Sequence, residues 1–177
     1  MSAGVDTDVK EQVGAWFAGR LPDDWFTGAA EVTVDREEIL VVGELPDVDL
    51  PSGSSAAAAA EAREARIQGW REDTRRQRMR IAHEAQRRFR RKVSWGAECG
   101  SERRLFTTVS MPVMTRLRMR EREVLDTLVE AGVARSRSHA LAWCVRLVRE
   151  NQGEWIDKLK EALVHVETAR AEGPTPS

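Results

Sequence analysis

Residues 114–149 read MTRLRMREREVLDTLVEAGVARSRSHALAWCVRLVR, and this stretch decides the fold of the C-terminal part of the chain. Polar and apolar residues alternate over residues 114–119, which predicts a short strand because successive side chains of a strand point to opposite faces. From about Arg120 the apolar residues recur at helical spacing. Gly132 predicts the end of that helix, since glycine readily adopts the left-handed conformation found at helix ends. A serine-containing turn and a second, largely apolar helix follow.

The predicted strand has two different faces. Leu117 and Thr115 share one face, and the opposite face carries Met114, Arg116 and Arg118. In the turn that follows the first helix, a serine can cap the second helix, and both Ser136 and Ser138 stand where such a cap is expected.

Both predicted helices are rich in apolar residues. A segment this small cannot bury so much apolar surface within one copy, and the sequence therefore predicts a homodimer. The residues expected in the dimer core are apolar positions of the strand and of both helices: Leu117, Leu125, Leu128, Leu141 and Val145.

This segment resembles the ribbon-helix-helix family of transcriptional regulators and antitoxins. The resemblance rests on RLRMREREVLDTLVEAGVARSRSHALAWCV and covers about 36 of the 177 residues. Its most specific parts are the Leu-Asp pair in the first helix and the pattern Gly-x-x-x-Ser-Arg-Ser-x-x-Leu that leads into the second. The resemblance implies that two protomers interlock and that their strands pair into an antiparallel ribbon, which enters the major groove of DNA.

The resemblance also implies roles for individual residues. The base readers are the outward residues of the strand: Arg116 and Arg118, with Met114 or Thr115 as accessories. An arginine can bond both acceptors of a guanine, which is worth about 1–3 kcal/mol of discrimination. The phosphate clamp is formed at the start of the second helix by Ser136, Arg137 and Ser138, where backbone amides and the positive helix end attract anions.

Two alternatives stay open for this region. The strand could use the upstream sequence LFTTVSM instead, which would move the base readers to Thr107 or Thr108 but leave an unusually long first helix. The strand and the two helices could also be simply the end of an α+β domain, without a partner copy or a nucleic acid.

Charge is divided unevenly along the chain. The formal net charge is −1, yet residues 1–50 hold 3 basic and 12 acidic side chains, whereas residues 63–92 hold 12 basic and 4 acidic ones. This division predicts a polarised surface or an internal contact between acidic and basic parts. Arginine outnumbers lysine 24 to 4, and its fork of donors suits phosphates and guanines.

The N-terminal part predicts an α+β fold: a helix at residues 7–19, a hairpin at 30–44, a Pro/Gly/Ser-rich loop, one long basic helix from Ala56 to about Lys92, and a second hairpin. The C-terminal ribbon-helix-helix-like region follows with an additional helix. The expected divisions are 1–50 (acidic helix and hairpin), 51–62 (linker or start of the long helix), 63–112 (basic helix and second hairpin, packed with 1–50), 113–170 (DNA binding and dimerisation) and 171–177 (tail).

The long helix is expected to display arginines around most of its circumference, Arg78 among them. Those expected to contact phosphate, on DNA or on RNA, lie near its C-terminal end: Arg87, Arg88, Arg90 and Arg91. The other interpretation of this run is a solvated face, or a surface on which the acidic first 50 residues dock.

Several classes of protein are not expected. No run of eighteen apolar residues occurs, so no membrane segment is predicted, and the acidic N-terminus lacks the apolar segment of a secretory signal. Two cysteines and three scattered histidines predict neither a disulfide framework nor a metal site, and no cofactor or enzyme motif is recognised.

The sequence therefore predicts a cytoplasmic, dimeric, sequence-specific DNA-binding protein that regulates transcription. The alternatives are a protein that binds RNA or the ribosome through the N-terminal unit and its arginine-rich helix, and an antitoxin-like protein whose N-terminal part binds a partner protein.

Overall fold

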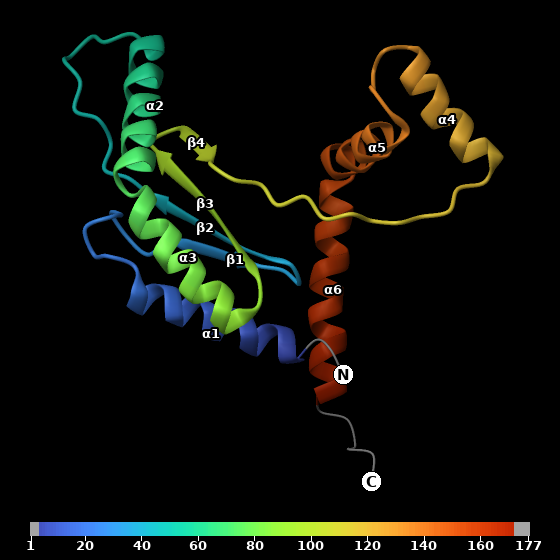
Figure 1. Cartoon of the computed structure of the whole chain (residues 1–177), viewed down its shortest axis with the longest axis horizontal. Coiled ribbons are helices and arrows are strands. Elements are labelled where there is room, and N and C mark those ends of the chain that lie inside the picture. The colour runs from blue at the N-terminus through green and yellow to red at the C-terminus, as the bar shows by residue number, and fades with distance from the viewer. Residues whose placement is uncertain (1–3, 172–177) are drawn as a thin grey trace. The chain divides into compact units, whose positions relative to one another are not determined.

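The computed structural model describes residues 4–171, and the chain divides into two compact units on either side of the Met111–Pro112 peptide bond (Figure 1). Unit 1 ends at Met111 and contains a mixed sheet with three helices. Unit 2 begins at Pro112 and contains three further helices. The α+β class that the sequence predicts is confirmed.

Four strands form the sheet of unit 1 in the order β1-β2-β3-β4. They are β1 (Glu31–Val34), β2 (Glu38–Glu44), β3 (Lys92–Cys99) and β4 (Glu102–Leu105). Both predicted hairpins are present, because β1 pairs antiparallel with β2 and β3 pairs antiparallel with β4. The second arm of the second hairpin, expected over residues 104–111, is shorter than predicted and ends at Leu105. The hairpins join through a parallel ladder in which Ile39 of β2 lies opposite Val93 of β3. A parallel pair needs a long crossover, and the basic helical segment supplies it.

The core of unit 1 lies between the helices and one face of the sheet. Ile39, Val41 and Trp95 alternate along β2 and β3, so their side chains share this face. They pack with Val13 and Phe17 of α1 (Gly4–Arg20), and both α1 residues are fully buried. Residues of α3 complete this cluster: Ile81 and Ala85.

The prediction of one long helix from Ala56 to Lys92 is wrong. The segment forms α2 (Ala56–Asp73) and α3 (Arg75–Phe89), which are separated at Thr74. The Thr74 hydroxyl donates to the backbone oxygen of Trp70 at 2.6 Å, and a hydroxyl that bonds back to the preceding turn bends a helix. Arg78 donates from Nε to Thr74 Oγ1 at 2.9 Å and from Nη2 to the backbone oxygen of Arg71 at 2.6 Å.

Arg78 is buried, which corrects the prediction that it belongs to the displayed arginines. Only 7% of the residue is exposed. Its guanidinium carbon lies 5.3 Å from the ring centre of Trp70, 6.0 Å from that of Trp95 and 5.0 Å from that of Phe106. Burial, followed by the nearby charges of Arg71 and Arg75, lowers the pKa of Arg78 to about 10.

Acidic and basic parts of unit 1 meet in two ion pairs that fasten its helices. Arg63 of α2 donates to both carboxylate oxygens of Asp47, each at 2.8 Å. Arg20 of α1 donates to both carboxylate oxygens of Glu84 on α3, at 2.7 and 2.9 Å. The expected internal acid–base contact therefore forms locally and leaves most arginines of α3 outside it.

Unit 2 consists of α4 (Met119–Glu130), α5 (Arg137–Asn151) and α6 (Gly153–Ala171). The strand predicted at residues 114–119 is not formed: Met119 is the first residue of α4, and residues 107–118 are neither helix nor strand. A strand is defined by a hydrogen-bonded neighbour. In the arrangement that the sequence predicts, that neighbour belongs to a second copy of the chain.

Gly96 gives a test of the sheet packing. A Cβ on this residue would lie 2.7 Å from Leu105 Cδ2 and 2.8 Å from the backbone oxygen of Arg104, whereas a Cβ on Gly69 in α2 would meet nothing within 4 Å. We expect Gly96→Ala to lower the free energy of unfolding by about 1–3 kcal/mol through overpacking. The control Gly69→Ala is expected to raise it by about 0.5–1 kcal/mol, because glycine disfavours helix interiors. Urea unfolding of both variants checks this, and equal effects would contradict it.

Candidate nucleic-acid interface

The turn between α4 and α5 is built on a left-handed glycine. Gly132 has a φ of 74°, as its predicted place at the end of the helix requires. Its amide donates to the backbone oxygen of Val129 at 3.0 Å, and the amide of Ala134 donates to that of Leu128 at 3.0 Å. These bonds satisfy carbonyls at the end of α4 and return the chain toward the start of α5.

Ser136, rather than Ser138, caps α5. Its hydroxyl accepts a hydrogen bond from the backbone amide of His139 at 3.2 Å, and its backbone is extended. The first turn of α5 contains no acidic residue of its own to offset the positive end of the helix dipole. The N-terminal end of α5 is therefore suited to an anion.

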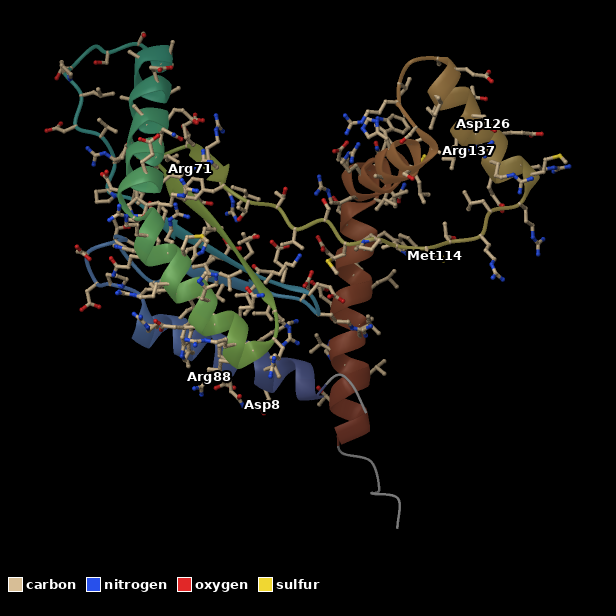
Figure 2. The ribbon with its side chains drawn as sticks, viewed as in Figure 1. Asp8, Arg71, Arg88, Met114, Asp126 and Arg137 are labelled. Atoms are coloured by element: carbon tan, nitrogen blue, oxygen red, sulfur yellow. The ribbon has the colours of Figure 1, made fainter. Side chains whose placement is uncertain are left out.

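Arg137 is engaged within the chain. Its Nε and Nη2 atoms each donate to one carboxylate oxygen of Asp126, both at 2.6 Å, and this pair joins α5 to α4 (Figure 2). The hydrogen bonds from Arg137 lower the pKa of Asp126, although both side chains are exposed. Sequence analysis missed this pair, because the two residues are separated by the turn and share no helical spacing.

The segment before α4 presents its arginines to solvent. Arg116, Arg118 and Thr115 are exposed, and Met114 is 98% exposed and projects from the chain (Figure 2). Leu117 is half-buried and packs on the small core of unit 2. Leu117 is the one position of this segment that faces inward, because Thr115, which the predicted strand places on the same face, is exposed.

Two hydrogen bonds fix how this segment enters α4. The backbone amide of Arg118 donates to the carboxylate of Glu121. Arg122 donates from Nη1 to the backbone oxygen of Leu117 at 2.7 Å. The first turn of α4 thus holds the end of the segment in place.

The core of unit 2 is small. Its buried members are Leu125, Ala134 and Ala140, and the half-buried side chains packed on them include three predicted core residues: Leu117, Leu128 and Leu141. The fifth predicted core residue, Val145, is 64% exposed. Other large apolar side chains of α5 and α6 are also exposed: Leu147, Val148, Trp155, Leu159, Leu163, Val164 and Val166.

The four arginines expected to contact phosphate near the end of α3 do not lie together. Arg87, Arg90 and Arg91 line one hollow of unit 1. Arg88 is outside it, and its guanidinium carbon lies 5.6 Å from the ring centre of Phe89. Arg91 is half-buried and donates from Nε to the backbone oxygen of Asp35 at 2.6 Å.

In the part of the chain that the structure describes, no three His, Cys, Asp and Glu side chains are placed to hold a metal ion. Cys99 is buried and Cys144 is half-buried, and both are free thiols. None of the described helices combines the length and the apolar character needed to cross a bilayer.

Comparison with known proteins assigns both units. Residues 11–105 match the N-terminal domain of Rv1265-like proteins, and residues 118–170 match the Mb1296 C-terminal domain. The uncharacterized proteins Mb1296 of Mycobacterium bovis and Rv1265 of Mycobacterium tuberculosis are each 58% identical to the chain over 159 residues, which is 90% of this chain and 69% of theirs. The chain belongs to the Rv1265-like family. No solved structure matches it.

The two domains of the Rv1265-like family leave a short segment between them. It comprises residues 106–117 and contains three of the four predicted base readers: Met114, Thr115 and Arg116. The fourth, Arg118, is the first residue of the C-terminal match. Helices α4 and α5, their caps and the ion pair between them lie within that match, and so does α6 except for its last residue, Ala171.

The cap of α5 gives a test of the site geometry. We expect Ser136→Ala to destabilise α5 by about 0.5–2 kcal/mol, because the substitution leaves the His139 amide without its acceptor. Ser138→Ala, two residues further on, is the matched control and is expected to have a much smaller effect. Thermal unfolding followed by circular dichroism measures both, and a larger effect at Ser138 would contradict the assignment of the cap.

Proposed function

We propose that this protein is a DNA-binding regulator of transcription that acts in the cytoplasm as a dimer, with two copies of unit 2 forming a ribbon-helix-helix arrangement. The observation that carries the proposal is an extended segment with outward arginines, placed directly before two helices whose apolar surface is largely unburied. The apolar surface supports the presence of a partner copy, and the arginines support recognition of DNA bases. The start of α5 supports a contact with phosphate.

The apolar surface of unit 2 supports the dimer. Only three hydrophobic residues in the described part of unit 2 are buried, while Val145, Leu147 and Val148 on α5 are 64%, 42% and 48% exposed. Full burial of one such side chain stabilises by about 1.5–3 kcal/mol. The stabilisation from burying several such side chains of each protomer exceeds the low end of the free-energy cost of association, which is about 4–15 kcal/mol. A second copy carries the same apolar surface, so a twofold interface can bury both.

The segment before α4 supports the ribbon. Residues 114–116 are not paired with another strand of the chain, so their backbone groups are available to an identical segment. The Leu117 carbonyl and the Arg118 amide are already engaged by Arg122 and Glu121. Pairing about a twofold axis would place Arg116 and Arg118 of both copies on one face of a two-stranded ribbon. A ribbon of this width fits the major groove, where guanidinium groups can bond guanine.

The start of α5 supports the phosphate contact. Because Arg137 is bound to Asp126, we assign it the role of bracing α4 against α5. Contact with phosphate then falls to the backbone amides of the first turn and to the exposed hydroxyl of Ser138. The sequence-based expectation likewise gives the phosphate contact to the backbone amides near Ser136, Arg137 and Ser138.

Val145 tests the dimer. We expect Val145→Asp to convert the dimer to a monomer, because a carboxylate would be buried in the apolar interface without a partner. Val164→Asp places the same change at a 60% exposed valine of α6, outside the proposed dimer core, and is expected to leave the dimer intact. Sedimentation equilibrium measures both variants. A chain that is already monomeric at micromolar concentration would rule out the proposal.

Arg116 and Arg118 test base recognition. We expect the double variant Arg116→Ala/Arg118→Ala to lose its preference between DNA sequences, with about 1–3 kcal/mol of discrimination lost for each base contact. The dimer is expected to persist. Arg146→Ala/Arg149→Ala removes the same charge from exposed positions of α5 and should keep the sequence preference.

Selection of binding sites from a random duplex library, followed by gel-shift titration, provides the measurement for this pair of variants. The same titration is carried out with RNA. An unchanged sequence preference in the Arg116/Arg118 variant, or tighter binding to RNA than to duplex DNA, would reject the assignment.

A further inference from the structure

A shallow basic hollow lies in unit 1 at the C-terminal end of α3. Its charged lining consists of Arg87, Arg90, Arg91, Lys92 and Glu37, and His83 also lines it. We call it the α3 hollow. It is separate from the extended segment and helices of unit 2 to which the proposed DNA recognition is assigned.

The turn after α3 explains why these cations converge. Arg90 ends the helix with a φ of 58°, and its amide donates to the backbone oxygen of Gln86 at 3.0 Å. This left-handed residue reverses the chain, so that β3 begins at Lys92. Arg90 is the only residue other than glycine with a positive φ among the described residues. Glycine would adopt this conformation at lower energy, but it would remove one cation from the hollow.

The positive charge of the α3 hollow is poorly neutralised within the chain. Helix α3 contains six arginines and one acidic residue, Glu84, and Arg20 of α1 occupies both carboxylate oxygens of Glu84. No described carboxylate forms an ion pair with Arg87, Arg90 or Lys92. Glu37 is the one acidic residue at the rim. Four permanent cations therefore face one carboxylate.

Part of the hollow is held rigidly. Arg91 donates from Nε to the backbone oxygen of Asp35 at 2.6 Å and from Nη1 to that of Phe89 at 3.3 Å. The backbone amide of Lys92 donates to the backbone oxygen of Glu37 at 3.0 Å. These bonds join the end of α3 to the turn between β1 and β2, and they orient the Arg91 guanidinium while leaving Nη2 able to donate. A preorganised guanidinium suits the oxygens of phosphate.

We propose that the α3 hollow is a phosphate-binding site. The chemistry it recognises is that of phosphate oxygens, and two sources can supply them. One is the backbone of duplex DNA, in which case unit 1 adds a contact independent of sequence; this source rests on the proposed function. The other is a small polyphosphate, which would bind whether or not the chain binds DNA.

The first test uses the full-length chain and duplex DNA over a range of salt concentrations. The variant is Arg87→Ala/Arg90→Gly, in which glycine preserves the left-handed turn. If DNA backbone occupies the hollow, affinity falls equally for all sequences, and the slope of log affinity against log salt decreases by about two. The control, Arg75→Ala/Arg76→Ala, removes two exposed arginines of α3 outside the hollow and should leave the slope nearly unchanged.

The second test measures the thermal unfolding midpoint of the same proteins with and without inorganic tripolyphosphate. A phosphate site predicts a rise of the midpoint for the unmodified chain and the control, and a loss of that rise in the Arg87/Arg90 variant. Far-ultraviolet circular dichroism of the variant verifies that it is folded.

The outcomes are distinct. A smaller salt slope in the Arg87/Arg90 variant alone identifies DNA as the source, and a tripolyphosphate effect with an unchanged slope identifies a small ligand. No effect in either test, or an equal effect in the control, overturns the proposal. If base recognition by unit 2 fails, the unmodified chain will show no preference between DNA sequences. The tripolyphosphate test still decides whether the α3 hollow binds phosphate, because it does not depend on DNA binding.

Discussion

The arrangement of unit 1 depends on one buried cation, Arg78. Burial of a guanidinium without a carboxylate partner is costly. Here two hydrogen bonds and the faces of three aromatic rings offset the cost, and a cation over a ring is worth about 2 kcal/mol when it is desolvated. Since Arg78 bonds Thr74 and Arg71 across the helix break, it fixes the direction in which α3 leaves α2. That direction brings Ile81 onto the sheet and carries the end of α3 to the start of β3.

The elements of unit 1 could be predicted from periodicity, but the helix break could not. The alternation of apolar and polar side chains along the strands, together with the turn residues between them, was sufficient to predict both hairpins. Thr74 lies in a run of good helix formers, and its effect depends on a back-bonded hydroxyl and on Arg78. Arginine counts as polar in any sequence pattern, so Arg78 was placed on the surface. Its burial follows from Trp70 and Phe106, which lie near it only in the folded chain.

In unit 2, the ends of the helices could be predicted from the local sequence, but the contacts across the turn between α4 and α5 could not. Gly132 and the Ser136 or Ser138 cap followed from backbone preferences that a sequence expresses directly. The Asp126–Arg137 pair crosses the turn, and its existence depends on the angle between α4 and α5. A strand that forms between two chains has its hydrogen-bonding partner in the other chain, so the ribbon stays a prediction. Within one chain, Leu117 packs on the core of unit 2 and its neighbours Arg116 and Arg118 are exposed.

The exposed valines and leucines of α5 have a consequence for gene dosage. If a second copy covers them, the folded population of unit 2 depends on how many molecules the cell contains. At low abundance most copies would be apart. If the protein binds DNA as a dimer, as proposed above, occupancy of its DNA site would then rise with the square of abundance rather than in proportion to it. Modest changes in synthesis or turnover of the protein would therefore be converted into steep changes in promoter occupancy.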